Sequence, residues 1–331
     1  MTVSRVVNSN GYVSQKTREK VLRVVEEMNY RSNGLARSLK RQRTDTIGLV
    51  LGDISNPYST ELARTVRQAA AAHGYNLFIC ISEYSAEEDI AAFEALANHS
   101  VDGLIVATRA NEAGDKYLRG LVENNLPVVV IGRDFIHEKV DHIAAGNQRG
   151  GFEATQHLLD LGHRRIGFIG ANITQKSKLK RLQGYLQALH EHNVEIDERL
   201  ITGRREAQTG APGYSTEEIG YEGMKRLLSL PNRPTAIFAR NDFTAIGAMT
   251  AIKEARLNIP HDVAIIGFDD IPLAQHTAPP LTTMRQPMRQ QGQLAADWLL
   301  RRIESKETPQ RLEQTLDCEL IVRESTVALK H

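Results

Sequence analysis

From Thr46 onward, short apolar runs alternate with amphipathic segments, and this alternation constrains the fold more than any other feature of the chain. Runs such as TIGLVLG (46–52), DGLIVA (102–107) and VAIIGF (263–268) are apolar throughout, so each predicts a strand that is buried on both faces. The segments between the runs place apolar residues three and four positions apart, as amphipathic helices do. The sequence therefore predicts an α/β fold in which helices cover both faces of parallel sheets.

The alternation falls into two blocks, which predict two doubly wound parallel-sheet lobes. In the first block we expect strands at 46–52, 75–81, 102–107 and 127–132. In the second block we expect strands at 165–170, 200–202, 235–239 and 263–268. Residues 282–331 are expected to cross back between the lobes and to contribute a strand at about 312–323. This arrangement gives a first lobe of about 45–146 and 287–312 and a second lobe of about 147–286 and 313–331.

The first 43 residues differ from the rest of the chain in charge. They hold ten Lys/Arg and three acidic residues, a formal charge of +7, whereas the whole chain carries +1, so residues 44–331 carry about −6 by subtraction. A basic head on a mildly acidic body favours contact with a polyanion, and phosphate neutralisation makes nucleic acid the leading candidate. A solvated helix face followed by a basic linker explains the same charge, and charge alone does not decide between the two interpretations.

Apolar spacing within this head predicts three short helices. Residues 2–8 form an amphipathic helix, and Ser14 is a candidate N-cap for a second helix over 14–29. Two helices that meet across a short turn are compatible with a helix-turn-helix. A third short helix over 33–39 ends at Leu39 beside several cations, an arrangement that suits entry into a DNA minor groove. A plain interdomain linker also accounts for this third segment.

Polar side chains follow the predicted strands at their carboxyl ends, where open parallel sheets bind ligands. Together these donors and acceptors, with an aromatic side chain among them, suit a small polyhydroxylated or amide-bearing ligand. Singly, Asp242 and Ser215 have a plainer interpretation as helix caps, and Arg181 as a surface ion-pair partner. The strand-end residues are Asp53, Asn56, Tyr58, Ser59, Ser82, Thr108, Arg109, Arg133, Asp134, Asn241, Asp242, Asp269, Asp270 and the segment 171–181.

Sequence motifs of enzymes and metal sites are missing. The chain has no GxGxxG, GxSxG or HExxH motif and no phosphate-binding P-loop. His190 and His192 stand two positions apart on a predicted helix, so their rings point away from each other. We therefore predict no enzymatic activity, no metal and no cofactor.

The cysteines and the apolar runs bear on the compartment. Cys80 and Cys318 lie far apart with no CxxC spacing, so each is expected to be a free thiol. No apolar run approaches the roughly 18 residues of a membrane span. We expect a cytoplasmic protein with no membrane partner.

Several segments in combination resemble the LacI/GalR family of transcriptional regulators, over residues 2 to about 327. The resemblance implies a helix-turn-helix DNA-binding headpiece (1–32), a hinge helix with its linker (33–44), and a two-lobed effector-binding and dimerisation domain of periplasmic-binding-protein type I (45–331). The segments are TVSRVVN (2–8), GYVSQKTREKVL (11–22), NGLARSL (33–39), GLVLGDISNPY (48–58), GHRRIGFI (162–169), RLQGY (181–185), NDFTAIGAM (241–249), IPHDVAIIGFDD (259–270) and PPLTTMRQP (279–287).

The resemblance also implies a function. The protein is expected to be a transcriptional regulator, in the usual case a repressor, that acts as a homodimer on double-stranded operator DNA. A small-molecule effector, expected to be a sugar or a related metabolite, binds between the two lobes and controls operator affinity allosterically.

Site residues follow from the resemblance position by position. Arg5 is the best candidate for a bidentate contact with guanine, and Leu39 matches the hinge leucine that wedges into the minor groove. The full DNA-binding set is Thr2, Ser4, Arg5, Asn8, Tyr12, Ser14, Thr17 and Leu39. The effector-binding set is Tyr58, Ser59, Ser177, Arg181, Ser215, Asn241 and Asp269.

Four features depart from the family pattern. Gly132 stands where many sugar-responsive members have Asp, and Ser59 and Ser215 stand where aromatic side chains are common, so the identity of the effector stays open. Members also have a further helix and turn ahead of the recognition helix, whereas this chain starts at Met1, inside that helix. The alternative hypothesis is a chain with a truncated headpiece, which binds the small molecule and dimerises without binding operator DNA specifically.

Overall fold

The computed structural model comprises two compact units, Met1–Thr46 and Ile47–His331. Six of the predicted site residues, Ser4, Arg5, Asn8, Leu39, Ser177 and Ser215, lie outside the residues that the structure describes, as does the predicted hinge helix. The structure describes residues 2, 6, 12–28, 43–109, 111–133, 135, 137–172, 179–204, 216–305 and 310–328.

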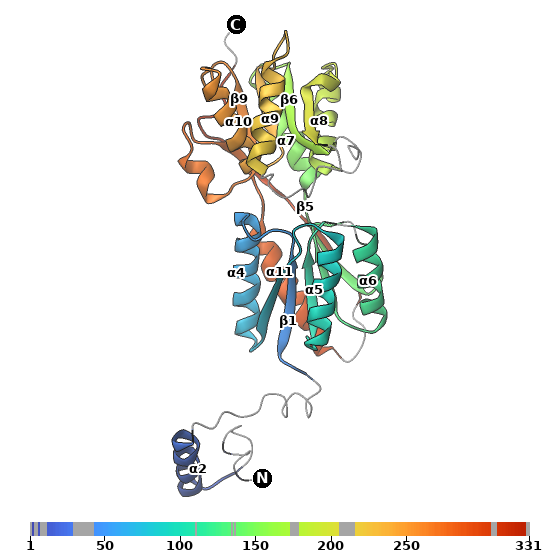
Figure 1. The fold of residues 1–331 in the computed structure, drawn as a ribbon, viewed down its shortest axis with the longest axis vertical. Helices are drawn as coiled ribbons and strands as arrows, with labels where there is room; N and C mark the ends of the chain where they lie inside the picture. Colours follow the sequence, from blue (N-terminus) through green and yellow to red (C-terminus); the bar gives the residue numbers. More distant parts are fainter. Residues whose placement is uncertain are drawn as a thin grey trace. The chain divides into compact units, whose positions relative to one another are not determined.

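The smaller unit contains helix α2, Gln15–Glu27, which confirms the helix predicted over 14–29 (Figure 1). Ser14 occupies the N-cap position, but its hydroxyl lies 2.9 Å from Thr17 Oγ1 and does not cap the backbone. Val21 and Val25 are half-buried, four positions apart, as expected for the inner face of an amphipathic helix.

A six-stranded sheet forms the first lobe of the larger unit, with the strand order β11-β5-β4-β3-β1-β2. Strands β1, β3, β4, β5 and β11 pair in parallel, and the apolar runs predict β1, β3 and β4 but not β5. The strands are β1 Thr46–Leu51, β2 Asn76–Ile81, β3 Gly103–Ala107, β4 Val128–Ile131, β5 Val140–Ala145 and β11 Glu313–Leu316.

Helices cover both faces of this sheet. Helices α4 (Pro57–Ala72) and α11 (Met288–Glu304) cover one face, where Leu62 and Leu299 pack in one core with Ile105 of β3. Helices α5 (Ala86–Asn98) and α6 (Glu112–Glu123) cover the other face, where Phe93 joins the next residue of β3, Val106. Successive residues of β3 thus enter opposite cores, which explains why the strand is apolar throughout.

The second lobe repeats this architecture around a sheet of order β12-β10-β9-β8-β6-β7. Strands β7, β6, β8, β9 and β10 pair in parallel, and the edge strand β12 runs antiparallel to β10. Its strands are β6 Ile166–Asn172, β7 Ile201–Arg204, β8 Ala236–Ala239, β9 Ala264–Asp269, β10 Thr282–Arg285 and β12 Glu319–Ile321. Its helices are α7 Asn147–Asp160, α8 Lys180–Glu191, α9 Thr216–Leu228 and α10 Asp242–Glu254, with short 3-10 turns at Glu198–Leu200 and Pro272–His276.

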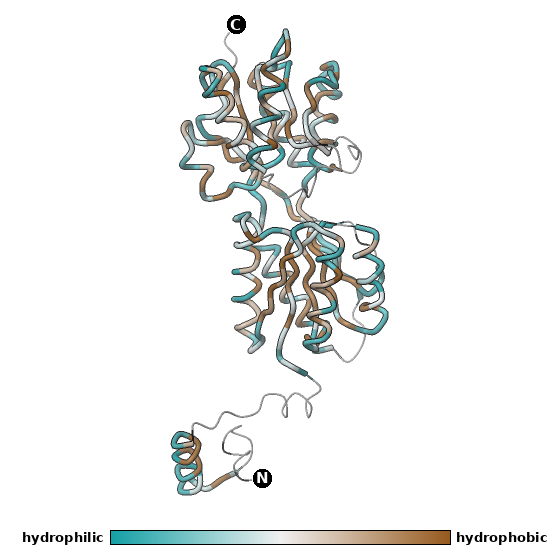
Figure 2. The backbone as a smooth tube through the Cα atoms, in the orientation of Figure 1, coloured by the Kyte–Doolittle hydropathy of each residue, from teal (hydrophilic) through white to brown (hydrophobic). Residues whose placement is uncertain are grey.

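Apolar residues are concentrated in the strands of both lobes, and the outward faces of the helices are hydrophilic (Figure 2). In the second lobe, α7 and α8 pack on one face of the sheet and α9 and α10 on the other. Each lobe is therefore a three-layer sandwich with two separate cores, which holds the carboxyl ends of its parallel strands in fixed positions.

The chain crosses between the lobes three times, from β5 to α7, from β10 to α11 and from β11 to β12. The predicted crossing within residues 282–331 is confirmed. The prediction of one strand over 312–323 is wrong, because Asp317 and Cys318 separate β11 from β12 and the two strands join different sheets. Residues 313–316 therefore belong to the first lobe, and their assignment to the second was also wrong.

A buried ion pair ties the last helix to strand β5. The Arg302 guanidinium donates from Nε and Nη2 to the two carboxylate oxygens of Asp141, each over 2.6 Å. Asp141 also accepts from the backbone N–H of Leu312. Both charged side chains are buried, and their bidentate geometry is the one in which a buried pair satisfies its own hydrogen bonds.

Over the part of the chain that the structure describes, no helix is both long enough and apolar enough to cross a membrane.

Candidate functional site

Tyr58 and Ser59 are positioned by the start of helix α4, directly after strand β1. Asn56 caps this helix by accepting from the backbone N–H of Tyr58 at 2.9 Å, and Pro57 fills the first helical position, where no N–H is needed. The Tyr58 hydroxyl donates to Gln291 Oε1 of helix α11 at 3.1 Å. Ser59 is buried beneath it. The Asn-Pro pair in the sequence therefore acts as a helix start that presents Tyr58 at the carboxyl end of the sheet.

Asp269 lies at the carboxyl end of β9 in a strained backbone conformation. Its φ is +123° and that of Asp270 is +56°, a region that residues other than glycine rarely adopt. Such strain costs about 1–3 kcal/mol and occurs mostly where the surrounding structure requires a particular side-chain direction. Asp269 is buried and accepts from Gln286 Nε2 at 2.6 Å.

Arg181 meets Asp269 from the first turn of helix α8. Its Nη2 lies 3.4 Å from Asp269 Oδ1, and its Nη1 donates to the Arg240 carbonyl oxygen at 2.5 Å. Its Nε donates to Asn147 Oδ1 at 2.8 Å, and the guanidinium carbon sits 3.7 Å above the Phe268 ring. Arg181 is therefore held from four sides, which makes it a fixed cation at this end of the sheet.

Charges from the second lobe act on Tyr58 of the first lobe. Burial raises the pKa of the Tyr58 phenol, Asp269 raises it further, and Arg181 lowers it. Burial also raises the pKa of Asp269 above its ordinary value, although Arg181 and the hydrogen bond from Gln286 oppose that shift. The structure thus brings together three of the predicted effector residues, Tyr58, Arg181 and Asp269.

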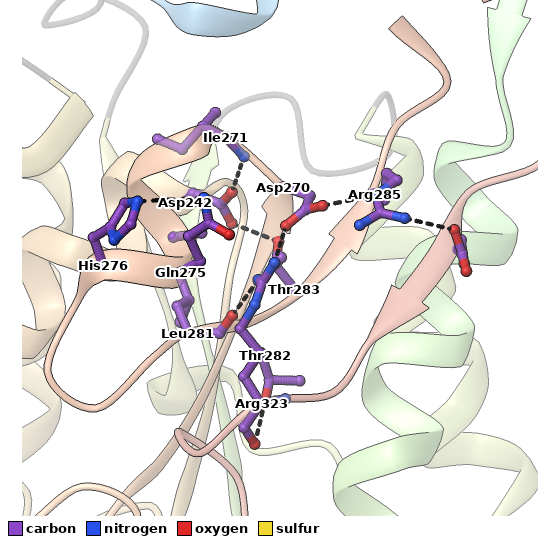
Figure 3. A network of polar contacts seen from close by, with 12 residues as sticks. Asp242, Asp270, Ile271, Gln275, His276, Leu281, Thr282, Thr283, Arg285 and Arg323 are labelled. Carbon is purple, nitrogen blue, oxygen red and sulfur yellow. Dashed lines mark hydrogen bonds and ion pairs between the residues drawn. The ribbon is translucent and has the colours of Figure 1, made fainter.

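The sequence predicts that Asp242 caps helix α10, but Asn241 caps it instead. The cap of α10 is Asn241, whose Oδ1 accepts from the backbone N–H of Thr244 at 2.9 Å. Asp242 is instead fully buried and accepts from the Thr283 hydroxyl at 2.5 Å and from the Ile271 N–H at 2.9 Å (Figure 3). Burial and the neighbouring Asp269 raise the pKa of Asp242 to about 7.

A second set of charges in Figure 3 holds the strands that lead into the crossing segments. Asp270 accepts from Arg285 Nε at 2.7 Å and from Arg323 Nη2 at 2.6 Å. Arg285 also pairs with Glu319, directly after the β11-to-β12 crossing, at 3.1 Å. Asp270 thus stands beside Asp269 and links the end of β10 to the segment after β12.

Three further predicted strand-end residues are engaged in the first lobe itself. The buried guanidinium of Arg133 donates to Thr108 Oγ1 at 2.7 Å and also bonds Asp115. Thr108 donates in turn to Asp89 at 3.3 Å. Ser82 is buried and bonds the carbonyl of Leu51. The strand-end rule found these positions, but their polar groups are used to hold the lobe together.

Sequence reasoning missed Arg240, Gln286 and Gln291. Arg240 and Gln286 are the first residues after strands β8 and β10, so the strand-end rule extended by one position finds both. Gln291 lies within helix α11, fully buried, and among the described residues its Nε2 has no hydrogen-bond partner. Helical spacing places Gln291 on the buried face with Met288 and Ala295, but no sequence pattern indicates that it meets Tyr58.

The described DNA-binding candidates lie in the smaller unit. Thr2 is helical and exposed, and Tyr12 is 92% exposed, which leaves its ring free for an external contact. Ser14 and Thr17 lie at the exposed start of α2 and bond each other. Their predicted contacts with DNA stay predictions. Among the residues described, no group of three or more His, Cys, Asp or Glu is arranged to hold a metal ion.

Comparison with known proteins gives the class to which this fold and site belong. Residues 1–33 match the family described as bacterial regulatory proteins, lacI family, and residues 155–326 match the periplasmic binding protein-like domain. The ribose operon repressor of Haemophilus influenzae is 36% identical over 331 residues, covering 99% of this chain and 95% of that protein. The regulator DegA of Bacillus subtilis is 39% identical, covering 88% of this chain and 84% of DegA.

Solved structures that are similar to this chain belong to the same class of regulator. The lac repressor dimer bound to operator and the anti-inducer ONPF is 26% identical with a TM-score of 0.84 over 99% of this chain and 95% of that one. The CelR–cellobiose complex is 31% identical with a TM-score of 0.74 over 98% and 94% of the two chains. A LacI family regulator from Enterococcus faecium with bound ribose is 29% identical with a TM-score of 0.72 over 86% and 100%.

The chain therefore belongs to the LacI family of transcriptional regulators. It is a transcriptional repressor with an effector-binding domain, and it is not an enzyme.

Proposed function

We propose that a small polyhydroxylated effector binds where the two lobes meet and controls the affinity of the repressor for its operator. The observation that carries this proposal is the Arg181–Asp269 pair, 3.4 Å apart at the carboxyl end of the second sheet and close enough to Tyr58 of the first lobe to affect its pKa. A ligand that contacts Tyr58 on one side and Asp269 on the other fixes the angle between the lobes, because each side chain is anchored in its own sheet.

The chemistry of the residues supports a ligand with several hydroxyl groups. Asp269 supplies an acceptor, Arg181 supplies donors, and the Tyr58 hydroxyl, which donates its proton to Gln291, supplies an acceptor. The buried Nε2 of Gln291, which has no partner among the described residues, adds one more donor beside Tyr58. Relatives of this chain were solved with cellobiose and with ribose, two polyhydroxylated molecules. Asn241 and Ser59, and Ser177 and Ser215 outside the described residues, complete the proposed effector set.

Operator binding is proposed for the smaller unit and the hinge segment. The first 43 residues carry a formal charge of +7, which favours contact with phosphates. Thr2, Tyr12, Ser14 and Thr17 are the described members of the proposed contact set, and Arg5 and Leu39 are its proposed base-reading and wedge residues.

A homodimer is proposed from the surface of strand β2. This strand is the edge of the first sheet, yet its sequence is NLFICI and the side chains of Phe78 and Ile79 are each 43% exposed. An apolar edge strand left in water is a site for pairing with another chain. A second copy of the chain, as in the lac repressor dimer, is the proposed partner.

Thermal unfolding of the full chain with a library of sugars, sugar acids and nucleosides tests the effector proposal. A ligand that binds only the folded protein raises Tm by mass action. We expect at least one compound to raise Tm, and Arg181→Met to abolish that shift. Arg199→Met removes an exposed arginine that pairs with Asp197 on the surface, and serves as the matched control that keeps the shift. A shift of equal size in wild type and Arg181→Met would place the ligand elsewhere.

A further inference from the structure

Three arginines gather at the ligand-side ends of the strands, which is more positive charge than a neutral ligand requires. Arg181 stands in the first turn of α8, Arg240 directly follows β8, and Arg109 follows β3 of the first lobe. Each therefore lies at the carboxyl end of a parallel strand or at the start of the helix beside it, the positions from which α/β sheets contact ligands.

Arg240 is built into this end of the second lobe. Its carbonyl oxygen accepts from Arg181 Nη1 at 2.5 Å, which links the two residues directly. Its side chain runs along Gly170, where an added Cβ would lie 2.5 Å from Arg240 Cγ and Cδ. Gly170 has a φ of +105°, a conformation that favours glycine. The missing side chain also leaves room for the Arg240 side chain. The course of this side chain is thus set by its surroundings.

Among the described residues, no carboxylate forms an ion pair with Arg109 or Arg240. Asp269 is already engaged by Arg181 and by Gln286. The Asp53 carboxylate accepts hydrogen bonds from the backbone N–H and the hydroxyl of Ser55, within its own loop. Within the described ranges neither Arg109 nor Arg240 has a carboxylate within 4.0 Å; Arg109 instead lies 3.9 Å above the Tyr84 ring.

The guanidiniums of Arg109 and Arg181 lie close enough to Arg240 to affect its pKa. Burial, followed by the charges of Arg109 and Arg181, lowers the pKa of its guanidinium to about 10, against smaller opposite effects of Tyr84 and Asp269. A guanidinium otherwise keeps its proton in proteins far above neutral pH. Helices α7 and α8 add to the positive potential, because no described side chain caps the N–H groups of their first turns.

We propose that the effector carries a negatively charged group, a carboxylate or a phosphate ester, on its polyhydroxylated frame, and that Arg240 and Arg109 bind that group. The inference rests on the proposed effector site and names the chemical class of its ligand. Arginine is suited to this task, since its planar donors match carboxylate and phosphate oxygens two at a time. Bound there, the anion removes the mutual repulsion of the two guanidiniums, whereas a neutral sugar leaves it in place.

Calorimetric titration of the full chain with matched pairs of compounds tests the inference. The probes are D-glucose with D-glucuronate and glucose 6-phosphate, D-galactose with D-galacturonate, and D-ribose with ribose 5-phosphate. We expect at least one acid to bind about tenfold or more tightly than its neutral parent, and the carboxylate and phosphate arms identify which anion is used. Arg240→Gln should remove about tenfold or more of that preference. Arg226→Gln, an exposed arginine on α9 of the same lobe, should keep it.

Unfolding of the ligand-free protein gives a test that does not depend on the choice of compounds. Arg240→Gln relieves repulsion, so its Tm at low ionic strength should exceed that of wild type by about 2 °C or more. Because salt screens the repulsion, the difference should shrink in about 0.5 M NaCl. Arg226→Gln should leave Tm unchanged under both conditions.

Two results would overturn the inference. A neutral sugar that binds as tightly as its acid, with equal affinity in wild type and Arg240→Gln, rejects the anionic class while leaving the effector site in place. Binding of no acid, together with a Tm for Arg240→Gln at or below that of wild type, shows that the arginines do not form an anion site.

Discussion

Arg181 and Asp269 form an ion pair of 3.4 Å in which both partners are held by other groups. Arg181 is fixed by Asn147 and by the Arg240 carbonyl, and Asp269 by Gln286 and by its strained backbone. Because each partner is positioned in the ligand-free protein, the pair offers preorganised donors and acceptors to the proposed effector, and little ordering of side chains would oppose its binding.

Asp269→Asn should weaken effector binding by about tenfold or more, because a charged acceptor is replaced by a neutral amide of the same shape. Asparagine tolerates positive φ, so the fold should persist. Calorimetry with a compound that raises Tm measures the change. Asp160→Asn, at the exposed end of α7, is the control and should bind as wild type. Unchanged affinity in Asp269→Asn would remove this residue from the site.

Arg302→Met should destabilise the effector-binding unit by about 3–5 kcal/mol, because it leaves the Asp141 carboxylate buried without its partner. Arg199→Met breaks the pair with Asp197, which solvent screens, and should cost much less stability. Urea unfolding of the two variants beside wild type measures both values. Equal losses in the two variants would show that the buried pair has no special role.

The buried carboxyl of Asp242 should make stability depend on pH. Its pKa is about 7 in the folded protein and 3.8 ordinarily, so between these values the folded state holds a proton that the unfolded state has lost. Unfolding then becomes more favourable as pH rises from about 4 to about 7, and the loss is complete above pH 7. Asp242→Asn should gain stability relative to wild type between pH 5 and pH 8 in urea unfolding. A difference that is constant with pH would contradict the assignment.

Phe78→Glu should convert the proposed dimer to a monomer, because it places a charge on the apolar edge strand β2. Light scattering after size-exclusion chromatography reports the mass. Ile196→Glu changes a similarly exposed apolar residue of the second lobe and should leave the dimer intact. A mutant Phe78→Glu with the mass of wild type would place the interface on another surface.

The sequence predicts the lobes well because their central strands are buried on both faces, which leaves continuous apolar runs. It missed β5 because Asp141 and His142 interrupt that strand, and the charge of Asp141 is balanced by Arg302, 161 positions away. Residues Glu313–Leu316 form β11, which pairs with β5 in the first sheet, so their placement also depends on a contact that is distant in the sequence. Local patterns carry no information about such partners.

For the site residues too, the sequence predicts those that local patterns mark and misses those that distant contacts place. Tyr58 and Asp269 follow strands that are obvious in the sequence, and the strand-end rule finds both. Gln291 is brought to Tyr58 by the packing of α11 on α4, across 233 positions, which no local spacing reveals. The rule also marks Arg133 and Thr108, but it cannot tell that their polar groups bond each other and not a ligand.

The central claim is that an effector held by the larger unit changes the affinity of the chain for its operator. Fluorescence anisotropy tests it most directly, with a labelled duplex from upstream of the protein's own gene, an unrelated duplex of equal length, and a compound that raises Tm. Leu39→Ala, at the proposed hinge wedge, serves as a second chain that should bind the duplex more weakly and the compound equally well. We expect wild type to prefer its own upstream duplex, and the compound to change that affinity by about fivefold or more. Equal affinity for both duplexes, or an operator affinity that a tightly bound compound leaves unchanged, would contradict the account.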